Sequence, residues 1–457
     1  MSDIRDYQVD HLLLLVGSNP VPNAVAGKLL TTTTHYYEAQ VLHGRVPNAV
    51  AGKLLTTTAG TITLIHSADG LDLAERLQSW FVRAGYSDAN VGLEEIKESD
   101  ALSVSKCVQD VLDGYKSQVL EERKRGSNTA NKVGTVRVGL NYTGGTKVMS
   151  VHAYLALKSW IENKDREAIF NRHPVFSYLD ARTLQMRFEQ VGERAPISFY
   201  VGREVNISIR DLLELHNWEP VIPPITEPVL PESATALLAI HSDLKKTEIW
   251  TKWRHDKLFQ GDGSSQAIPW PNLPELQEAM SKELGQHDSQ FLNLTTAKGS
   301  GCKDESELRK WASGAWLESA VLLALQNCAQ ELHLGECCMD IKPKVRGYPG
   351  DELFQFDVAT IRGYQLFAFS CTTDSGRKGL LKQKLFEADV RARQMGGDEA
   401  RTALVCCAEP KTVNALEVEM RRDVVLKGRI RVFGREHLAN LTEHIKKWII
   451  EQSGDRK

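Results

Sequence analysis

The chain has 457 residues, with 56 Lys or Arg and 59 Asp or Glu, which leave a formal net charge of −3. This length allows two or three domains, and the balanced charge excludes a global basic field, so any nucleic-acid site must be local. The eight cysteines form no C-x-x-C pair, which favours free thiols over a zinc site or a secreted disulfide framework. With a polar N-terminus and only short apolar runs, we expect a soluble, cytoplasmic protein without a membrane segment.

The first part of the chain alternates between predicted strands and predicted helices. His11–Val16 is a nearly continuous apolar run, which is typical of a strand buried on both faces. The later strands are expected at Thr61–His66 and Thr135–Leu140, and the helices at Asn23–Leu30, Leu71–Ala84, Ser105–Tyr115 and Val148–Trp160. This alternation predicts a parallel, doubly wound α/β sheet over about residues 8–200, with ligands bound beyond the carboxyl ends of the strands.

A glycine-rich turn, Asn141-Tyr-Thr-Gly-Gly-Thr-Lys147, lies between the third strand and the helix that follows it. Adjacent glycines let backbone N–H groups approach a ligand closely, and a helix N-terminus together with Lys147 adds positive charge. A phosphate fits such a place, although the spacing is neither that of the P-loop nor that of the dinucleotide fingerprint. A tight turn that merely happens to contain a lysine is the alternative.

An exact repeat lies within this first domain. The 13 residues Val21–Thr33 recur unchanged at Val46–Thr58, with a period of 25 residues. Two copies do not make a solenoid. The fold needs one helix here, which either copy could form, and the other copy, with Thr34–Arg45, is expected to be a surface excursion.

The second half of the chain begins with a proline-rich segment. Trp218–Glu232 contains five prolines and is predicted to be an interdomain linker, followed by a small adaptor region of short helical patterns up to residue 300. Beyond it we expect helices at Ser306–Leu325 and Gly379–Met395, and strands near Met339–Val345, Phe354–Ile361, Gln365–Thr372 and Thr402–Cys407. This order indicates a second α/β module.

Acidic side chains in this module suggest a cation site. Glu318 lies in the predicted helix and Asp357 in a strand, and the adjacent strand carries Ser370 and Thr372 on one face. Converging carboxylates bind Mg²⁺ or Mn²⁺, together with water and phosphate. A solvated helix face is the alternative for Glu318. Lys384 shares a helix face with Glu387 and Arg391, which is typical of surface ion pairs but would also suit contact with a scissile phosphate.

These motifs resemble a known family. Residues 11–200 resemble the CARF domain, the CRISPR-associated Rossmann fold, through Gly17-Ser-Asn-Pro20 and Asn141–Met149. The C-terminal module resembles the PD-(D/E)xK nuclease half of CARF-fused CRISPR ancillary nucleases. The motifs that carry this likeness are Gly314-Ala-Trp-Leu-Glu318, Gln355-Phe-Asp-Val358 and Arg391-Ala-Arg-Gln-Met-Gly-Gly397. The resemblance implies a CARF domain at 8–205, a linker and adaptor at 206–300, and a restriction-endonuclease-like domain at 301–457.

The resemblance also implies a function. A homodimeric type III CRISPR accessory effector would bind cyclic oligoadenylate, with cyclic tetra-adenylate as the expected ring, and would then cleave DNA or RNA with Mg²⁺ or Mn²⁺. The implied ligand-binding residues follow the first and third strands: Ser18, Asn19, Asn141, Thr143, Gly144, Gly145, Thr146 and Lys147.

The nuclease motif departs from the family pattern at its last strand. The family carries Glu-x-Lys there, whereas this chain has Ser370-Cys371-Thr372. Glu318 and Asp357 remain as metal ligands, and Lys382 or, preferably, Lys384 could restore the missing cation. The expected catalytic set is Glu318, Gln355, Asp357, Ser370, Thr372 and Lys384. Three functions stay open: a ligand-activated nuclease, a cyclic-oligoadenylate sensor with an inactive nuclease domain that signals to a partner, and an enzyme that degrades the ring in its first domain.

Overall fold

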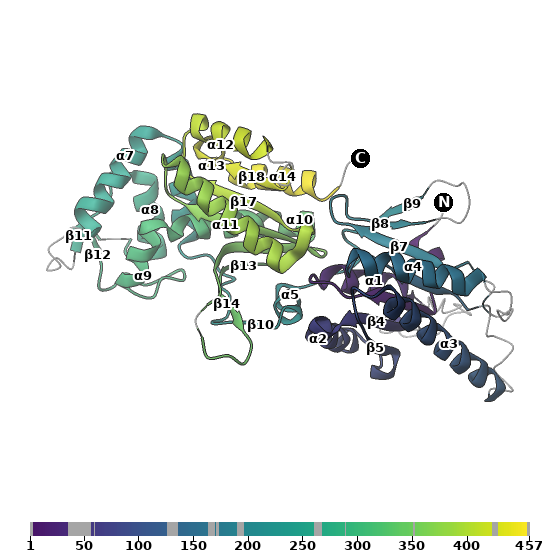
Figure 1. Ribbon diagram of the computed structural model, residues 1–457. Coiled ribbons are helices and arrows are strands. Elements are labelled where there is room, and N and C mark those ends of the chain that lie inside the picture. Colours follow the sequence, from purple (N-terminus) through teal and green to yellow (C-terminus); the bar gives the residue numbers. More distant parts are fainter. Residues whose placement is uncertain are drawn as a thin grey trace, which may run out of the picture. The chain divides into compact units, whose positions relative to one another are not determined.

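The computed structural model describes residues 3–34, 56–58, 60–125, 136–162, 170, 173–189, 196–259, 267–287, 289–350, 352–422 and 428–454 (Figure 1). The chain forms two compact units, which are described separately below. The first comprises Met1–Val205 with Glu214–Asn217, and the second comprises Asn206–Leu213 with Trp218–Lys457. Helix α5 (Ile209–Leu215) belongs partly to each.

The first unit is built on one sheet of seven strands in the order β5-β4-β1-β6-β7-β8-β9. Strands β5, β4, β1, β6 and β7 run parallel, while β7, β8 and β9 form an antiparallel meander. The bounds are β1 His11–Leu15, β4 Thr61–Ser67, β5 Val91–Ile96, β6 Val138–Asn141, β7 Val175–Asp180, β8 Gln185–Phe188 and β9 Ile197–Tyr200. The predicted Rossmann-like α/β fold is therefore confirmed.

Helices cover both faces of this sheet, as the continuous apolar strands require. All five residues of β1 are buried. Leu13 and Leu15 pack toward α3 (Ala101–Arg125) and α4 (Lys147–Glu162). The opposite face meets α1 (Val21–Leu30) and α2 (Leu71–Arg83). Each buried leucine stabilises the fold by roughly 1.5–3 kcal/mol.

The repeat is divided between a helix and a short hairpin. The first copy forms α1. Its Pro22 lies in the first turn of the helix, where a backbone N–H would have no hydrogen-bond partner within the helix, so a proline costs nothing there. The end of this copy, β2 (Thr32–Thr34), pairs antiparallel with β3 (Thr56–Thr58) at the end of the second copy. The expected surface excursion and the rest of the second copy lie outside the described residues.

The buried imidazole of His11 should make the stability of the first unit depend on pH. It stacks on Tyr115 with ring centroids 4.4 Å apart, and burial lowers the pKa of His11 to about 4, from 6.5. The fold therefore favours the neutral ring, so this contribution to stability is complete above pH 6.5 and is lost as the pH falls toward 4. The loss amounts to about 3 kcal/mol. In urea denaturation, His11→Gln should lose less stability than the wild type between about pH 7 and about pH 4.5, and parallel losses would contradict the assignment.

The second unit contains a five-stranded mixed sheet in the order β13-β15-β16-β17-β18. The first three strands are antiparallel and the last three are parallel. The bounds are β13 Leu334–Ile341, β15 Phe356–Arg362, β16 Gln365–Thr372, β17 Arg401–Cys406 and β18 Ile430–Phe433. Helices α11 (Lys378–Gly396) and α12 (Pro410–Arg422) lie near β17 and β18 in Figure 1. The predicted α/β module is thus present.

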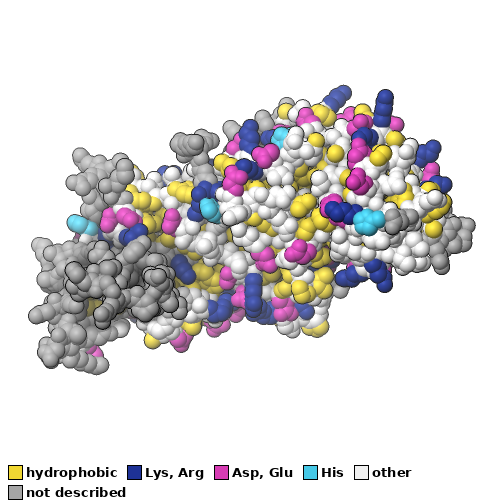
Figure 2. All heavy atoms as spheres, turned by 180° about the vertical axis from the view of Figure 1, so that it is seen from behind, with side chains coloured by type: hydrophobic (Ala, Val, Ile, Leu, Met, Phe, Trp, Pro, Cys, Tyr) yellow, Lys and Arg dark blue, Asp and Glu magenta, His cyan; other side chains and the backbone are white. Residues whose placement is uncertain are grey.

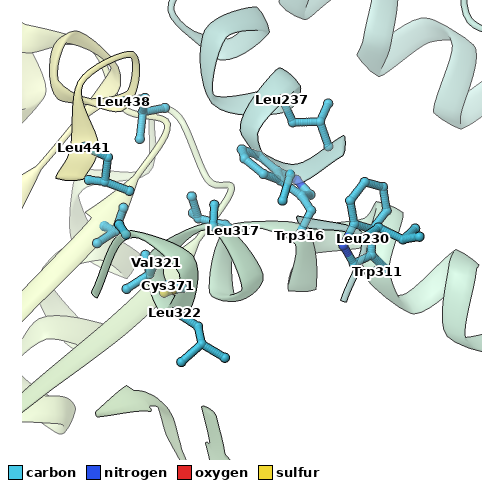
Figure 3. Packing of buried hydrophobic residues seen from close by; sticks show 14 of the residues in the cluster. Leu230, Leu237, Trp311, Trp316, Leu317, Val321, Leu322, Cys371, Leu438 and Leu441 are labelled. Atoms are coloured by element: carbon cyan, nitrogen blue, oxygen red, sulfur yellow. The ribbon is translucent and has the colours of Figure 1, made fainter. Parts of the chain in front are cut away.

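The core of this unit forms around α10 (Trp316–Leu332) and α14 (Leu441–Gln452), with α13 (Arg435–Leu438) at its margin. Figure 3 shows Trp316 of α10 near Leu237 of α6 (Pro231–His241), with Leu317 and Val321 further along α10. The same core includes a group of small elements: α7 Leu244–Trp253, α8 Pro274–Glu283, α9 Glu305–Lys310, β11 Ala267–Pro269 and β12 Phe291–Asn293. The adaptor region is therefore packed into the second unit.

The proline-rich segment, predicted to be an interdomain linker, pairs through its backbone with the second unit. Its first strand, β10 (Trp218–Pro220), pairs antiparallel with β14 (Pro343–Val345) of the second unit. Ile225 forms a further bridge with Met339. Two-stranded ladders of this kind tolerate prolines because an edge strand needs few N–H donors. The segment is thus fixed by backbone pairing.

The surface agrees with the balanced charge of the sequence. On the face shown in Figure 2, Lys and Arg side chains are interspersed with Asp and Glu. All eight cysteines are free thiols. Within the described residues, no helix has the length and apolar character that crossing a membrane requires.

Candidate functional site

Two loops meet at the carboxyl ends of β1 and β6 in the first unit. A side-chain Cβ at Gly17 would lie 2.7 Å from the backbone nitrogen of Gly145, and one at Gly144 would lie 2.0 Å from the carbonyl oxygen of Leu15. Gly145 has φ +74°, in the left-handed region that favours glycine. The glycines of the Gly-Gly-Thr-Lys turn therefore allow the two loops to touch through their backbones.

Gly144→Ala is expected to destabilise the first unit. The new methyl group would collide with the Leu15 carbonyl, a backbone atom that cannot turn aside, and such overpacking costs about 1–3 kcal/mol. Chemical denaturation measures the effect. Gly114→Ala is the matched control, because a Cβ at this position would meet no atom within 4 Å. Gly114 lies inside α3, where alanine is more favourable than glycine by roughly 1 kcal/mol. Equal stability of the two variants would contradict the packing role.

Several of the predicted ligand residues hold the turn together through their side chains. Asn141 accepts from Thr143 N at 3.2 Å and donates to Ser177 Oγ at 3.0 Å. Thr143 Oγ1 accepts from the backbone of Leu179 at 2.7 Å. Thr146 Oγ1 accepts from Met149 N at 3.2 Å, which caps the start of α4. These three residues are thus placed as a scaffold for the turn.

The remaining predicted ligand residues lie on or near the surface. Ser18 and Lys147 are exposed, and Lys147 is the first residue of α4. The side chain of Asn19 accepts from Val21 N at 3.0 Å, which directs the chain into α1. An exposed ammonium group at a helix N-terminus, beside a turn of two glycines, has the chemistry for binding a phosphate group.

In the second unit, the residue Glu318 follows a break in the predicted helix Ser306–Leu325. Helix α9 ends at Lys310, a π-helical turn spans Trp311–Ala315, and α10 then begins. Arg254 Nη1 donates to the carbonyls of Ala312 at 3.1 Å and Ser313 at 3.2 Å. These bonds satisfy carbonyl groups at the break and fix the first turn of α10, which carries Glu318.

The carboxylates of Glu318 and Asp357 interact electrostatically in this unit. Burial, with the nearby charges of Asp357 and Asp340, raises the pKa of Glu318 to about 8. Burial also raises the pKa of Asp357, against the opposing effects of a hydrogen bond from Cys371 N and the ammonium of Lys384. Two neighbouring carboxyl groups repel each other when both are ionised, which favours the protonated form of one of them. A bound cation would stabilise the state in which both are anions.

Two carboxylates can be enough to bind a divalent cation that keeps part of its water shell. Among the described residues, no group of three or more His, Cys, Asp or Glu side chains has the geometry of a complete metal site. Mg²⁺ is commonly held by only one or two carboxylates, with water and phosphate completing the shell. Glu318 and Asp357 are therefore the residues that would hold Mg²⁺ or Mn²⁺.

The other predicted catalytic residues have distinct places. Ser370 Oγ donates to Asp357 Oδ2 at 3.2 Å, and Cys371 N donates to the same oxygen at 2.7 Å. Thr372 Oγ1 accepts from Asp374 N at 3.3 Å, so this hydroxyl is used in a local turn. Lys384 lies within electrostatic range of both Glu318 and Asp357. The alternative lysine, Lys382, instead forms an ion pair with Glu419.

Two contributors escaped the sequence interpretation. Gln355 Nε2 donates at 2.8 Å to Asp340, a buried carboxylate in β13 that we had not singled out. In the first unit, buried Asn23 donates to the Leu15 carbonyl at 2.9 Å and so fixes the end of β1. A polar residue inside an apolar run is the only sequence signal for either.

Comparisons with known proteins identify the fold. No protein-family model matches the chain, and no curated protein does. Protein VC1899 from Vibrio cholerae has a solved structure with a TM-score of 0.62 at 16% identity, covering 97% of this chain and 99% of that one. Can2 from Sulfobacillus thermosulfidooxidans, solved in complex with cyclic tetra-adenylate, gives a TM-score of 0.62 at 13% identity, covering 98% and 99%. At such identities the likeness shows that this chain shares their fold along nearly its whole length.

Proposed function

We propose that the chain is a CRISPR effector that binds cyclic tetra-adenylate through its first unit and, when activated, cleaves nucleic acid with its second. The observation that carries the proposal is the fold shared with Can2, whose structure contains that ring. The exposed Lys147 beside Gly144 and Gly145 supplies the phosphate-binding chemistry. A cyclic, symmetric ligand suits a two-fold pair of such turns, so the proposal includes a homodimer.

The second unit would hydrolyse a phosphodiester. A bound Mg²⁺ or Mn²⁺ would supply positive charge against the oxygens of the scissile phosphate. Hydrogen bonds from Cys371 N and Ser370 Oγ hold the carboxylate of Asp357, and the carboxyl group of Glu318 on α10 interacts with it electrostatically. The buried position of the carboxylates strengthens each of these electrostatic interactions.

A cleavage assay tests this proposal. Single-stranded and supercoiled substrates should be cut when cyclic tetra-adenylate and Mn²⁺ are both present, and should stay intact when either is left out. Single-stranded DNA, single-stranded RNA and supercoiled DNA are tested separately, so that the assay also identifies the substrate. Cleavage that does not depend on the ring would contradict the link between the two activities.

A sensor without nuclease activity is the second candidate. It is favoured by one observation: Ser370 and Thr372 stand where the resembling nucleases carry Glu and Lys. The Ser370 hydroxyl donates to Asp357 on the neighbouring strand, and the Thr372 hydroxyl accepts from Asp374 N. If the wild type binds the ring tightly but cuts none of these substrates with any metal, the sensor function replaces the nuclease function.

A further inference from the structure

A second acidic residue faces Asp357 from the neighbouring strand. Strand β13 pairs antiparallel with β15 through Met339↔Val358 and Ile341↔Phe356. Asp340 lies between Met339 and Ile341 on β13. It therefore stands opposite Asp357, which lies between the partners of these two residues on β15. On the other side of Asp357, the β15–β16 register ends at Val358↔Phe369, which brings Ser370 opposite Asp357. Asp340, Asp357 and Ser370 thus form one row across three strands.

The Asp340 carboxylate holds a lysine at this centre. Lys342 Nζ lies 2.8 Å from one oxygen of Asp340 and 3.1 Å from the other. Gln355 Nε2 donates to Asp340 Oδ1 at 2.8 Å. Asp340 itself is only 7% exposed, and it adopts φ +57° inside the strand, an unusual conformation for a residue other than glycine. The carboxylate of Asp340 is thus held between Lys342 and Gln355.

Lys342 lies within electrostatic range of Glu318 and can be reached from solvent. Its side chain is 20% exposed. Asp340 chiefly, and Glu318 with Glu352 more weakly, raise the pKa of the Lys342 ammonium, so the group stays charged. Asp340 also raises the pKa values of Glu318 and Asp357, which places all three carboxylates within electrostatic range. One lysine is therefore anchored on Asp340, which stands opposite Asp357 in the neighbouring strand.

We propose that Lys342 is the catalytic cation of this centre, in place of the lysine that is absent at Thr372, and that Asp340 and Gln355 position it. This inference rests on the proposed function. During hydrolysis, a water oxygen bonds to phosphorus, the bond to the leaving oxygen breaks, and the proton lost by the water neutralises the leaving oxygen through solvent. Negative charge grows on the non-bridging oxygens in the transition state, and Lys342 donates a hydrogen bond to one of them while remaining protonated.

The kinetic test compares three single variants of the full chain, assayed with the ring and Mn²⁺. Lys342→Met should lower kcat by about 10²-fold or more with little change in KM, since the interaction forms in the transition state. Lys342→Arg retains the charge and should recover most of this loss. Lys446→Met is the matched control, because Lys446 forms a 2.7 Å ion pair with Glu331 in the same unit and should leave kcat unchanged. A kcat for Lys342→Met within threefold of the wild type would overturn the assignment.

Mn²⁺ affinity, measured by calorimetry on the same proteins, gives a readout that does not depend on cleavage. Lys342→Met removes a positive charge beside Asp340, so Mn²⁺ should bind roughly three- to tenfold more tightly. Asp340→Asn removes a negative charge and should weaken binding by a similar factor. If the wild type cleaves nothing, the proposed nuclease function fails, and calorimetry still decides the placement of Lys342. Tighter binding to Lys342→Met would then support the placement, and unchanged binding would overturn it.

Discussion

Replacing Asp357 with Ala is expected to lower ring-activated cleavage by at least about 10³-fold, the scale on which the loss of one essential catalytic group acts. Asp357 is the better fixed of the two proposed metal ligands, because Cys371 N and Ser370 Oγ both donate to its Oδ2. Its removal leaves Glu318 as the only member of the proposed pair. The rate is measured as initial velocity at saturating Mn²⁺ and cyclic tetra-adenylate.

Two controls separate this effect from a general loss of structure. Asp357→Ala should bind the ring as the wild type does, because Asp357 and the Gly-Gly-Thr-Lys turn belong to different compact units. Asp256→Ala removes an exposed aspartate of the second unit that forms an ion pair with His255, and this variant should cut normally. Cleavage by Asp357→Ala within tenfold of the wild-type rate would exclude Asp357 as a metal ligand.

Lys147→Ala is expected to weaken cyclic tetra-adenylate binding by about tenfold or more per site, since a charge-assisted hydrogen bond to phosphate contributes roughly 1.5–3 kcal/mol. Lys147 is exposed at the start of α4, where the helix N-terminus also favours an anion. Calorimetry measures the dissociation constant directly. Lys158→Ala changes an exposed lysine of the same helix, three turns further on, and should bind normally. Equal affinities for the two variants would remove Lys147 from the ring site.

The elements that the sequence predicts well are those whose signal is local. The apolar run of β1 and the Gly-Gly turn after β6 each follow from residue type and spacing alone. Strand β16, predicted at Gln365–Thr372, has those bounds in the structure. The meander β7–β9 was not predicted, because its short strands depend on pairing with one another for their stability.

The candidate centre of the second unit was predicted only in part, for physical reasons that involve distant contacts. The π-helical break before Glu318 depends on Arg254, which is about 60 residues away in sequence and satisfies the freed carbonyls. Asp340 occurs in Cys337-Cys-Met-Asp-Ile341, where one polar residue in an apolar run is a weak signal that does not by itself identify a site. Its importance emerges only when β13 is paired with β15 and Asp340 stands opposite Asp357.

The hairpin β2–β3 brings the two ends of the duplicated segment together by backbone pairing. Thr32 pairs with Thr58 and Thr34 with Thr56, so the residues at the two ends of this segment lie side by side. Because the copied tract ends in threonines, the duplication supplied the two β-prone strands that join its own ends. Excising either copy with its spacer yields the same shorter sequence, in which Leu30 is followed by three threonines and then Ala59. With either copy removed, α1 would still be followed by three threonines that lead to Ala59 and then to β4.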